Sequence, residues 1–295
     1  MPHPPLEAGT EIAPGYAVIE HLRRGNDLDV YDAWSHERRA RVAIKMLRGD
    51  RAHKVGARQA LITEGELLER FTHPHIVRAY ETLRRPLPAV VMETLSGATL
   101  SALIEEEPAP DAEGVAHLGL QIASALDYLH SHRLVHLDLK PSNLIGEAGR
   151  VKLIDLSLAQ APGPVRAGRG SYHYLSPEQA RGDAVDTAAD VWGIGAVLFE
   201  VATGEAPYDD DPDAFTEVES ASGTYSEAAP DRYPQLERAP RRPEDVGRID
   251  PELASVIADC LHLQPAKRPS LDGLMARLEV IAHVPDSERF WSRSR

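Results

Sequence analysis

The sequence predicts an α+β fold with two lobes, a small, mainly antiparallel β lobe that carries one helix and a larger, mainly helical lobe after it. Short apolar runs bounded by turn residues fill most of the first third of the chain. After Ser96-Gly97 the apolar residues instead recur every three or four positions. We expect lobes over 16–95 and 96–284, an N-terminal extension (1–15) and a C-terminal tail (285–295).

In the first lobe, three antiparallel strands are predicted over 16–22, 30–34 and 42–47, with a turn at Gly25-Asn-Asp between the first two. A helical spacing of apolar residues follows and stops at His73-Pro74. The apolar runs 76–80 and 89–92 predict two further strands.

In the second lobe, a one-sided apolar spacing over 115–129 predicts an amphipathic helix. Short β-like pieces are expected at 134–137, 143–145 and 151–154. The segment 188–202 is apolar nearly all round, which predicts a helix buried in the middle of the lobe. A long acidic and proline-rich excursion is expected over 209–248, followed by helices at 251–263 and 271–281.

Charge and cysteine content exclude several classes of protein. The chain has 295 residues, 32 Lys and Arg, 46 Asp and Glu, and a net charge of −14. Thirteen of the acids lie between 182 and 231, where no base occurs, and the remaining 33 acids against 32 bases leave −1. We expect no nucleic-acid binding, because that needs a basic face. Cys260 is the single cysteine, so neither an internal disulfide nor a thiolate zinc cluster can form.

The longest apolar run, 191–202, is broken by Glu200 and is shorter than the roughly 20 residues that a bilayer span requires. The first fifteen residues lack the basic and then apolar layout of a secretory signal. We therefore expect a cytoplasmic protein without a membrane span.

Chemically useful residues gather in two short loops between apolar segments. Asp138, Lys140 and Asn143 lie in one loop, and Asp155 begins the other. A carboxylate, an ammonium group and two oxygen ligands for a hard cation suit phosphoryl transfer, in which Mg²⁺ and a cation screen the phosphates. Taken alone, the cluster could also be a polar turn between buried strands.

At these residues the chain resembles a protein kinase. Val135-His-Leu-Asp-Leu-Lys-Pro-Ser-Asn143 looks like the catalytic loop, and Asp155-Leu-Ser157 takes the place of the DFG element. Val42-Ala-Ile-Lys45 is similar to the strand whose lysine contacts ATP. The resemblance extends over about 16–281 and implies the two-lobed protein-kinase fold.

Glu64 lies on the apolar stripe of its helix, three residues after Leu61 and four before Leu68. A carboxylate that faces a core is costly unless a cation meets it, and Lys45 is the obvious partner. The alternative is a Glu64 that faces solvent on an exposed helix.

Three further positions resemble kinases of proteins rather than of small molecules. Ser176-Pro-Glu178 takes the place of the APE element, and Arg268 matches the arginine that pairs with its glutamate. Asp190 matches the aspartate that steadies the catalytic loop. Lys140, two residues after Asp138, is the serine/threonine-type pattern, and Gln179-Ala-Arg-Gly182 resembles bacterial members, the Hanks-type kinases.

The resemblance implies a role for each of these residues. Asp138 would orient the acceptor hydroxyl, and Lys140 would screen the γ-phosphate. Asn143 and Asp155 would hold Mg²⁺, with Mn²⁺ as an alternative ion, and Lys45 paired with Glu64 would orient ATP. The residues implied around the nucleotide are Gly25, Val30, Ala43, Met92, Glu93, Leu95 and Ile145, and those of the regulatory spine are Leu68, Ala79, His136 and Leu156.

The glycine-rich loop departs from the family pattern. Of its three glycines only Gly25 is present, and Arg23 and Leu28 replace the others. Side chains there restrict how closely the backbone approaches phosphates, which predicts weaker ATP binding or slower turnover.

The arginine that usually precedes the catalytic aspartate is Leu137 here, as in non-RD kinases. In other members that arginine meets a phosphate on the activation segment. No hydroxyl-bearing residue lies between 158 and 170. We therefore expect activity that does not need phosphorylation of this segment.

The main hypothesis is a serine/threonine protein kinase. Two alternatives stay open at this point: a pseudokinase or scaffold that binds nucleotide weakly and recruits a partner, and a small-molecule phosphotransferase on a related fold. The acidic excursion is either a solvated loop or a surface that selects a basic protein substrate. The sequence does not indicate an oligomeric state.

Overall fold

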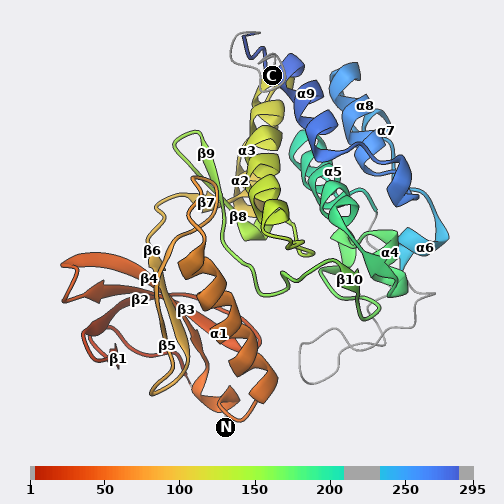
Figure 1. Cartoon of the computed structure of the whole chain (residues 1–295). Helices are drawn as coiled ribbons and strands as arrows, with labels where there is room; N and C mark the ends of the chain where they lie inside the picture. The colour runs from red at the N-terminus through yellow and green to blue at the C-terminus, as the bar shows by residue number, and fades with distance from the viewer. Residues whose placement is uncertain (1–3, 209–232, 286–295) are drawn as a thin grey trace. The chain divides into compact units, whose positions relative to one another are not determined.

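The computed structural model describes residues 4–208 and 233–285, which form two compact units (Figure 1). The first unit holds the described residues up to Ser96 together with Ile154–Ser157. The second unit holds the other described residues. A mainly antiparallel first unit and a mainly helical second unit confirm the predicted α+β fold.

One six-stranded sheet forms the first unit, in the order β1-β2-β3-β4-β6-β5, with every neighbouring pair antiparallel. The first three predicted strands are present and slightly longer than expected. The strand expected at 76–80 starts later, at Ala79, because the N–H of Ile76 is used in a turn, where it donates to the carbonyl oxygen of His73. The bounds of the strands are β1 Glu11–Ala13, β2 Tyr16–Arg24, β3 Leu28–Ser35, β4 Ala40–Leu47, β5 Ala79–Leu83 and β6 Ala89–Glu93.

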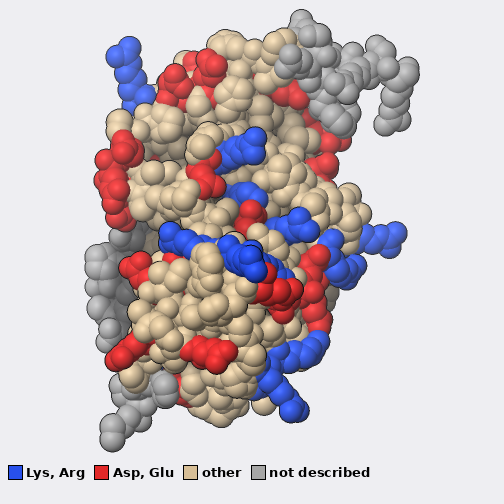
Figure 2. Space-filling view, turned by 90° about the vertical axis from the view of Figure 1, so that its left-hand side faces the viewer, with Lys and Arg blue, Asp and Glu red and all other residues tan. Residues whose placement is uncertain are grey.

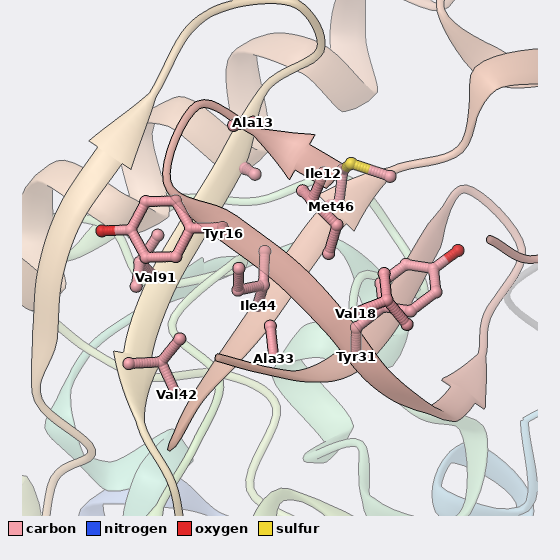
Figure 3. Close-up of a cluster of buried hydrophobic side chains, with 11 residues drawn as sticks. Ile12, Ala13, Tyr16, Val18, Tyr31, Ala33, Val42, Ile44, Met46 and Val91 are labelled. Atoms are coloured by element: carbon pink, nitrogen blue, oxygen red, sulfur yellow. The ribbon is translucent and has the colours of Figure 1, made fainter. Parts of the chain in front are cut away.

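One face of this sheet packs into an apolar core and the other carries Lys45. Along β4, Val42, Ile44 and Met46 point into a buried apolar cluster, together with residues such as Tyr31 and Val91 (Figure 3). Because side chains alternate along a strand, Ala43 and Lys45 lie on the opposite face. The apolar cluster therefore fixes the register that presents Lys45 on the other side of the sheet.

Helix α1 (Val55–Arg70) covers that opposite face. It approaches β6 closely at Gly65, where an added Cβ would lie 2.8 Å from Cγ2 of Val90. Glu64 is the neighbouring residue and is buried at 1% exposure. The close approach at Gly65 thus brings a carboxylate down onto the face that carries Lys45.

In the second unit, α5 is the central helix and is buried nearly all round, as predicted. Helices α3 and α8 pack against it, and α9 packs against both of these (Figure 1). The helices of this unit are α2 Leu100–Glu106, α3 Ala112–Ser131, α4 Pro177–Arg181, α5 Thr187–Thr203, α6 Pro234–Glu237, α7 Pro243–Val246, α8 Pro251–Cys260 and α9 Leu271–Ile281. Its strands are β7 Ala98–Thr99, β8 Leu144–Glu147, β9 Arg150–Leu153, β10 Gly163–Pro164 and β11 Ala184–Val185.

The predicted acidic excursion lies mostly outside the described residues, including Asp209, Asp210, Asp211, Asp213, Glu217 and Glu219. Its described part, from Tyr233, contains the short helices α6 and α7. Within 4–208 and 233–285, no helix is both long and apolar enough to cross a bilayer. On the face that Figure 2 presents, acidic and basic side chains are interspersed.

The packing at Gly65 yields a first prediction. Gly65→Val should lower the free energy of unfolding by about 1–3 kcal/mol, because the added carbons overpack against Thr82 and Val90. Denaturant unfolding of the purified protein measures this change.

Gly56→Ala is the matched control, since Gly56 lies in the same helix with nothing within 4 Å of an added Cβ. It should raise the free energy of unfolding by roughly 0.5–1 kcal/mol through helix propensity. Equal effects of both substitutions would contradict the close approach at Gly65.

Candidate active site

A buried cluster of three charges lies in the first unit. The ammonium nitrogen of Lys45 donates to both carboxylate oxygens of Glu64, at 2.7 and 2.8 Å, and to Oδ2 of Asp155 at 2.9 Å. The predicted Lys45–Glu64 ion pair is therefore present, and Glu64 does not face solvent. The contact with Asp155 adds a second carboxylate to the same cation.

The charge state of this cluster follows from burial and from its neighbours. Burial and the Asp155 charge raise the pKa of Glu64 to about 7. For Asp155 burial acts in the same direction, but the charge of Lys45 and hydrogen bonds from Ser157 outweigh it and lower the pKa. For Lys45, burial lowers the pKa, but the charges of Asp155 and Glu64 outweigh this effect, so the pKa is raised. Asp155 is thus anionic at neutral pH and suited to binding a cation.

Three of the predicted nucleotide residues of the first unit share the face of Lys45, whereas Glu93 lies directly opposite Val42 and so belongs to the other face. Val30 of β3 lies directly opposite Lys45, and Ala43 of β4 lies directly opposite Met92 of β6. Directly opposed residues of neighbouring strands point to the same side. Gly25, Glu93 and Leu95 belong to the same unit, whereas Ile145 lies on β8 in the second unit.

The carboxylate of Asp138 is the centre of a second set of contacts, in the second unit. Nδ2 of Asn143 donates to Oδ2 of Asp138 at 3.0 Å, and Nζ of Lys140 lies 3.1 Å from the same oxygen. The hydroxyl of Ser171 donates to Oδ1 of Asp138 at 2.7 Å. Lys140 also donates to the Ser171 hydroxyl oxygen. A carboxylate, an ammonium group and a serine hydroxyl are thus in mutual contact.

The loop that carries Asp138 is fastened to α5 by Asp190. This carboxylate, 1% exposed, accepts hydrogen bonds from the backbone N–H groups of His136 at 2.8 Å and Leu137 at 2.9 Å. Its Oδ2 also lies 2.8 Å from Nε2 of His130 on α3. Leu137 has a φ of +67°, a conformation that costs a non-glycine residue about 1–3 kcal/mol. The contacts of Asp190 hold the loop in this strained form. The resemblance implies that Asp190 steadies the loop, but the strain at Leu137 was not expected.

A buried ion pair joins α4 to the segment before α9. The guanidinium of Arg268 donates to both carboxylate oxygens of Glu178, at 2.6 and 2.8 Å, with side-chain exposures of 0% and 4%. It also donates to the carbonyl oxygens of His262 and Ala188, and it lies over the ring of Trp192. This is the pair that the sequence predicts.

Comparison with known proteins agrees with these arrangements. The family model for the protein kinase domain matches residues 16–278. The chain belongs to the protein kinase family.

Proteins similar to this chain include bacterial proteins named as serine/threonine-protein kinases. A protein of Lactococcus lactis named "Probable serine/threonine-protein kinase PknB" is 33% identical over 216 residues, which cover 70% of this chain and 34% of the relative. The "Serine/threonine-protein kinase PknB" of Mycobacterium leprae is 36% identical over 180 residues, covering 57% and 29%. That of Mycolicibacterium smegmatis is 32% identical over 267 residues, covering 86% and 40%. This kinase chain matches roughly a third of the length of these relatives.

The donors for a divalent cation fit Mg²⁺ in kind. The amide nitrogen of Asn143 is used by Asp138, and its amide oxygen accepts no hydrogen bond from the described residues. Asp155 offers an ionised carboxylate. Among the residues that the structure describes, no three His, Cys, Asp or Glu side chains form a metal cluster of their own. Few protein ligands, all of them oxygens, are usual for Mg²⁺ bound with phosphates.

Three residues of the kinase site were not expected from the sequence. Ser171 and His130 contact partners 33 and 60 residues away in the chain, so no local pattern marks them. Gln179 was noted only as part of a bacterial-type motif, but its Nε2 donates to the carbonyl oxygens of Leu137 and Arg169. To find them, one would have to predict which buried polar groups form hydrogen bonds with one another.

The Arg268–Glu178 pair yields a second prediction. Glu178→Gln should lower the free energy of unfolding by about 3–5 kcal/mol, because it leaves the Arg268 charge buried without a counter-charge. Urea unfolding of the purified kinase measures the loss.

Asp259→Asn is the control, because it breaks the exposed pair between Asp259 and Arg277. That change should cost less than about 1 kcal/mol. The prediction is wrong if Glu178→Gln costs no more than its control.

Proposed function

We propose that this kinase transfers the γ-phosphoryl group of ATP to serine and threonine hydroxyls of protein substrates. The observation that carries the proposal is the contact between the Asp138 carboxylate and the Ser171 hydroxyl, at 2.7 Å. Asp138 therefore has an oxygen placed to accept a hydrogen bond from a seryl group. A carboxylate in this position can take the proton of an attacking hydroxyl.

In the proposed reaction, the substrate hydroxyl oxygen forms a bond to the γ-phosphorus and its proton passes to Asp138. The bond between the γ-phosphorus and the β–γ bridging oxygen breaks, and ADP leaves with that electron pair. Asn143 keeps the carboxylate of Asp138 in one orientation through its amide N–H. Lys140, 3.1 Å from the carboxylate, screens the charge of the transferred group.

The first unit supplies the binding of the nucleotide. Lys45, held by Glu64, presents its ammonium group to the α- and β-phosphates, and Val30, Ala43 and Met92 line the same face of the sheet. Asp155 and Asn143 would hold Mg²⁺, which neutralises phosphate charge when bound.

Several further features support a protein substrate. The buried Glu178–Arg268 pair fixes the end of the activation segment, a few residues after Ser171 in the sequence. The relatives named above are serine/threonine-protein kinases by name. A basic substrate, selected by the acidic segment, and a cytoplasmic location stay predictions.

The roles of the two units can be tested separately. Asp138→Asn should lower the rate of phosphoryl transfer by roughly 10²- to 10⁴-fold, because it removes the proton acceptor. Transfer of labelled γ-phosphate to a generic basic protein measures the rate, and ATP affinity should stay close to that of the unchanged protein.

Asp127→Asn is the control, because Asp127 is an exposed carboxylate of α3. It should leave the rate unchanged. If the unchanged protein and Asp138→Asn give the same background while both bind ATP, the chain is a pseudokinase and the proposal fails.

We also propose that activity does not depend on phosphorylation of the activation segment. Leu137, in place of an arginine, is buried with Val135, Val165, Val185 and Ala189. Val165 follows β10, which pairs with β11 through Gly163–Val185 and Pro164–Ala184. Apolar packing and strand pairing therefore hold the segment where other family members use a phosphate and an arginine.

Phosphatase treatment should accordingly leave the rate within about two-fold of the untreated value, since no charged contact depends on the phosphate. Leu137→Ala should slow transfer, because it removes the contact that positions the segment. Both are measured with the same transfer assay, with intact mass to verify the phosphorylation state. Loss of turnover after phosphatase treatment would overturn this part of the proposal.

A further inference from the structure

Arg23 stands where the family pattern has the first glycine of the loop that covers the nucleotide. In the sheet, Arg23 of β2 lies directly opposite Val30 of β3, and Val30 lies directly opposite Lys45 of β4. Directly opposed residues point to the same face, so the three side chains form one row across three strands. Because neighbouring strands are about 4.8 Å apart, the Cα atoms of Arg23 and Lys45 are separated by two such spacings, about 10 Å.

The face that carries this row is the nucleotide face and not the core face. Tyr31 and Ile44, the neighbours of Val30 and Lys45 along their strands, point into the buried apolar cluster (Figure 3). Arg23 therefore points away from that cluster and toward the side on which Lys45 lies.

A β-bulge produces this orientation. The pairing of β2 with β3 shifts register between His21 and Arg23, so that Leu22 is an extra residue in β2. Without the extra residue, Arg23 would follow His21 onto the face of Tyr31. With it, Arg24 takes that face instead and forms a bidentate ion pair with Asp29, at 2.9 and 2.8 Å.

Arg24, Arg48 and Lys54, the neighbouring cations of this hairpin, each contact groups of the protein itself. Arg24 binds Asp29, Arg48 donates to the carbonyl oxygens of Gly25 and Asn26, and Lys54 donates to Asp27 at 2.7 Å. The guanidinium of Arg23 is exposed and makes no hydrogen bond or ion pair with any described residue. The hairpin is thus pinned in place while one arginine on its nucleotide face is left for a ligand.

The charges on this face of the sheet favour an additional cation that binds phosphate. Lys45 is shared by two carboxylates, so the cluster of Lys45, Glu64 and Asp155 contributes at most one positive charge against two negative ones. A nucleotide triphosphate is itself strongly anionic and needs cations. An arginine binds phosphate oxygens through two parallel N–H groups, which makes it a better phosphate ligand than a neutral side chain.

We infer that Arg23 is a phosphate-binding residue for the nucleotide. Its guanidinium replaces, by a charged contact, the close backbone approach that the missing glycines would have allowed. This inference rests on the proposed function only in placing ATP on this face of the sheet. It reverses the sequence-based expectation that Arg23 weakens nucleotide binding.

The test is direct binding by calorimetry, with Mg²⁺ present, of ATP, ADP and adenosine. Arg23→Gly, which restores the family residue, should weaken ATP and ADP binding about ten-fold or more, the loss expected for one charge-assisted contact. Adenosine affinity should not change, because adenosine has no phosphate. Arg23→Lys should retain part of the affinity.

Leu28→Gly is the matched control, since it restores the other missing glycine of the same hairpin and keeps the cation. It should leave ATP affinity equal to or higher than that of the unchanged protein. Thermal unfolding of each variant checks that the fold is intact.

Unchanged or tighter ATP binding by Arg23→Gly would overturn the inference, and so would equal losses for ATP and adenosine. If Arg23→Gly weakens binding of a phosphoserine peptide but not of ATP, Arg23 instead serves a phosphorylated substrate and the inference is wrong. If the unchanged protein binds neither ATP nor ADP, it also fails. If ATP binding depends on Arg23 while no phosphate is transferred, the proposed function fails and this inference stands.

Discussion

The buried carboxylate of Asp190 is the contact on which the catalytic loop depends. A charge inside α5 is tolerated only because two backbone N–H groups and His130 meet it, and these same bonds hold Leu137 in its strained conformation. Asp138 follows directly in the chain, so the position of its carboxylate, the proposed proton acceptor, is set by a helix buried in the core. The position of the catalytic loop in the second unit thus depends on the hydrogen bonds that one buried carboxylate, that of Asp190, accepts.

The first unit solves a similar problem differently. Its apolar cluster fixes the sheet register, the register fixes the face of Lys45, and Gly65 lets α1 come near enough for Glu64 to reach that lysine. The buried charges of Lys45, Glu64 and Asp155 contact one another within the unit rather than solvent. Packing and electrostatics are therefore not separable here, because a change in either shifts the position of the same ammonium group.

Much of this was predictable from the sequence, for identifiable reasons. Strands β2 to β4 are short apolar runs between turn residues, α3 has a one-sided apolar period, and α5 is apolar nearly all round. Glu64 indicates its partner because a carboxylate on an apolar stripe needs a cation. The short strand β1 has too few residues to show a period, although Ile12 and Ala13 are buried in the core. The contacts of Ser171 and His130 span long stretches of chain and have no local signature. The face of the sheet on which Arg23 lies depends on a β-bulge, and the residue types in this strand do not indicate a bulge.

The bulge at Leu22 has a consequence for comparing related chains. The identity of Leu22 matters little, since its side chain is 54% exposed, but its presence decides which of two adjacent arginines lies on the face of Lys45. Deletion of Leu22 would leave Arg23 and Arg24 adjacent in the sequence and yet exchange the faces of the sheet on which they lie. Alignments of this hairpin should therefore be anchored on strand pairing, because a change of length here changes the face on which each arginine lies.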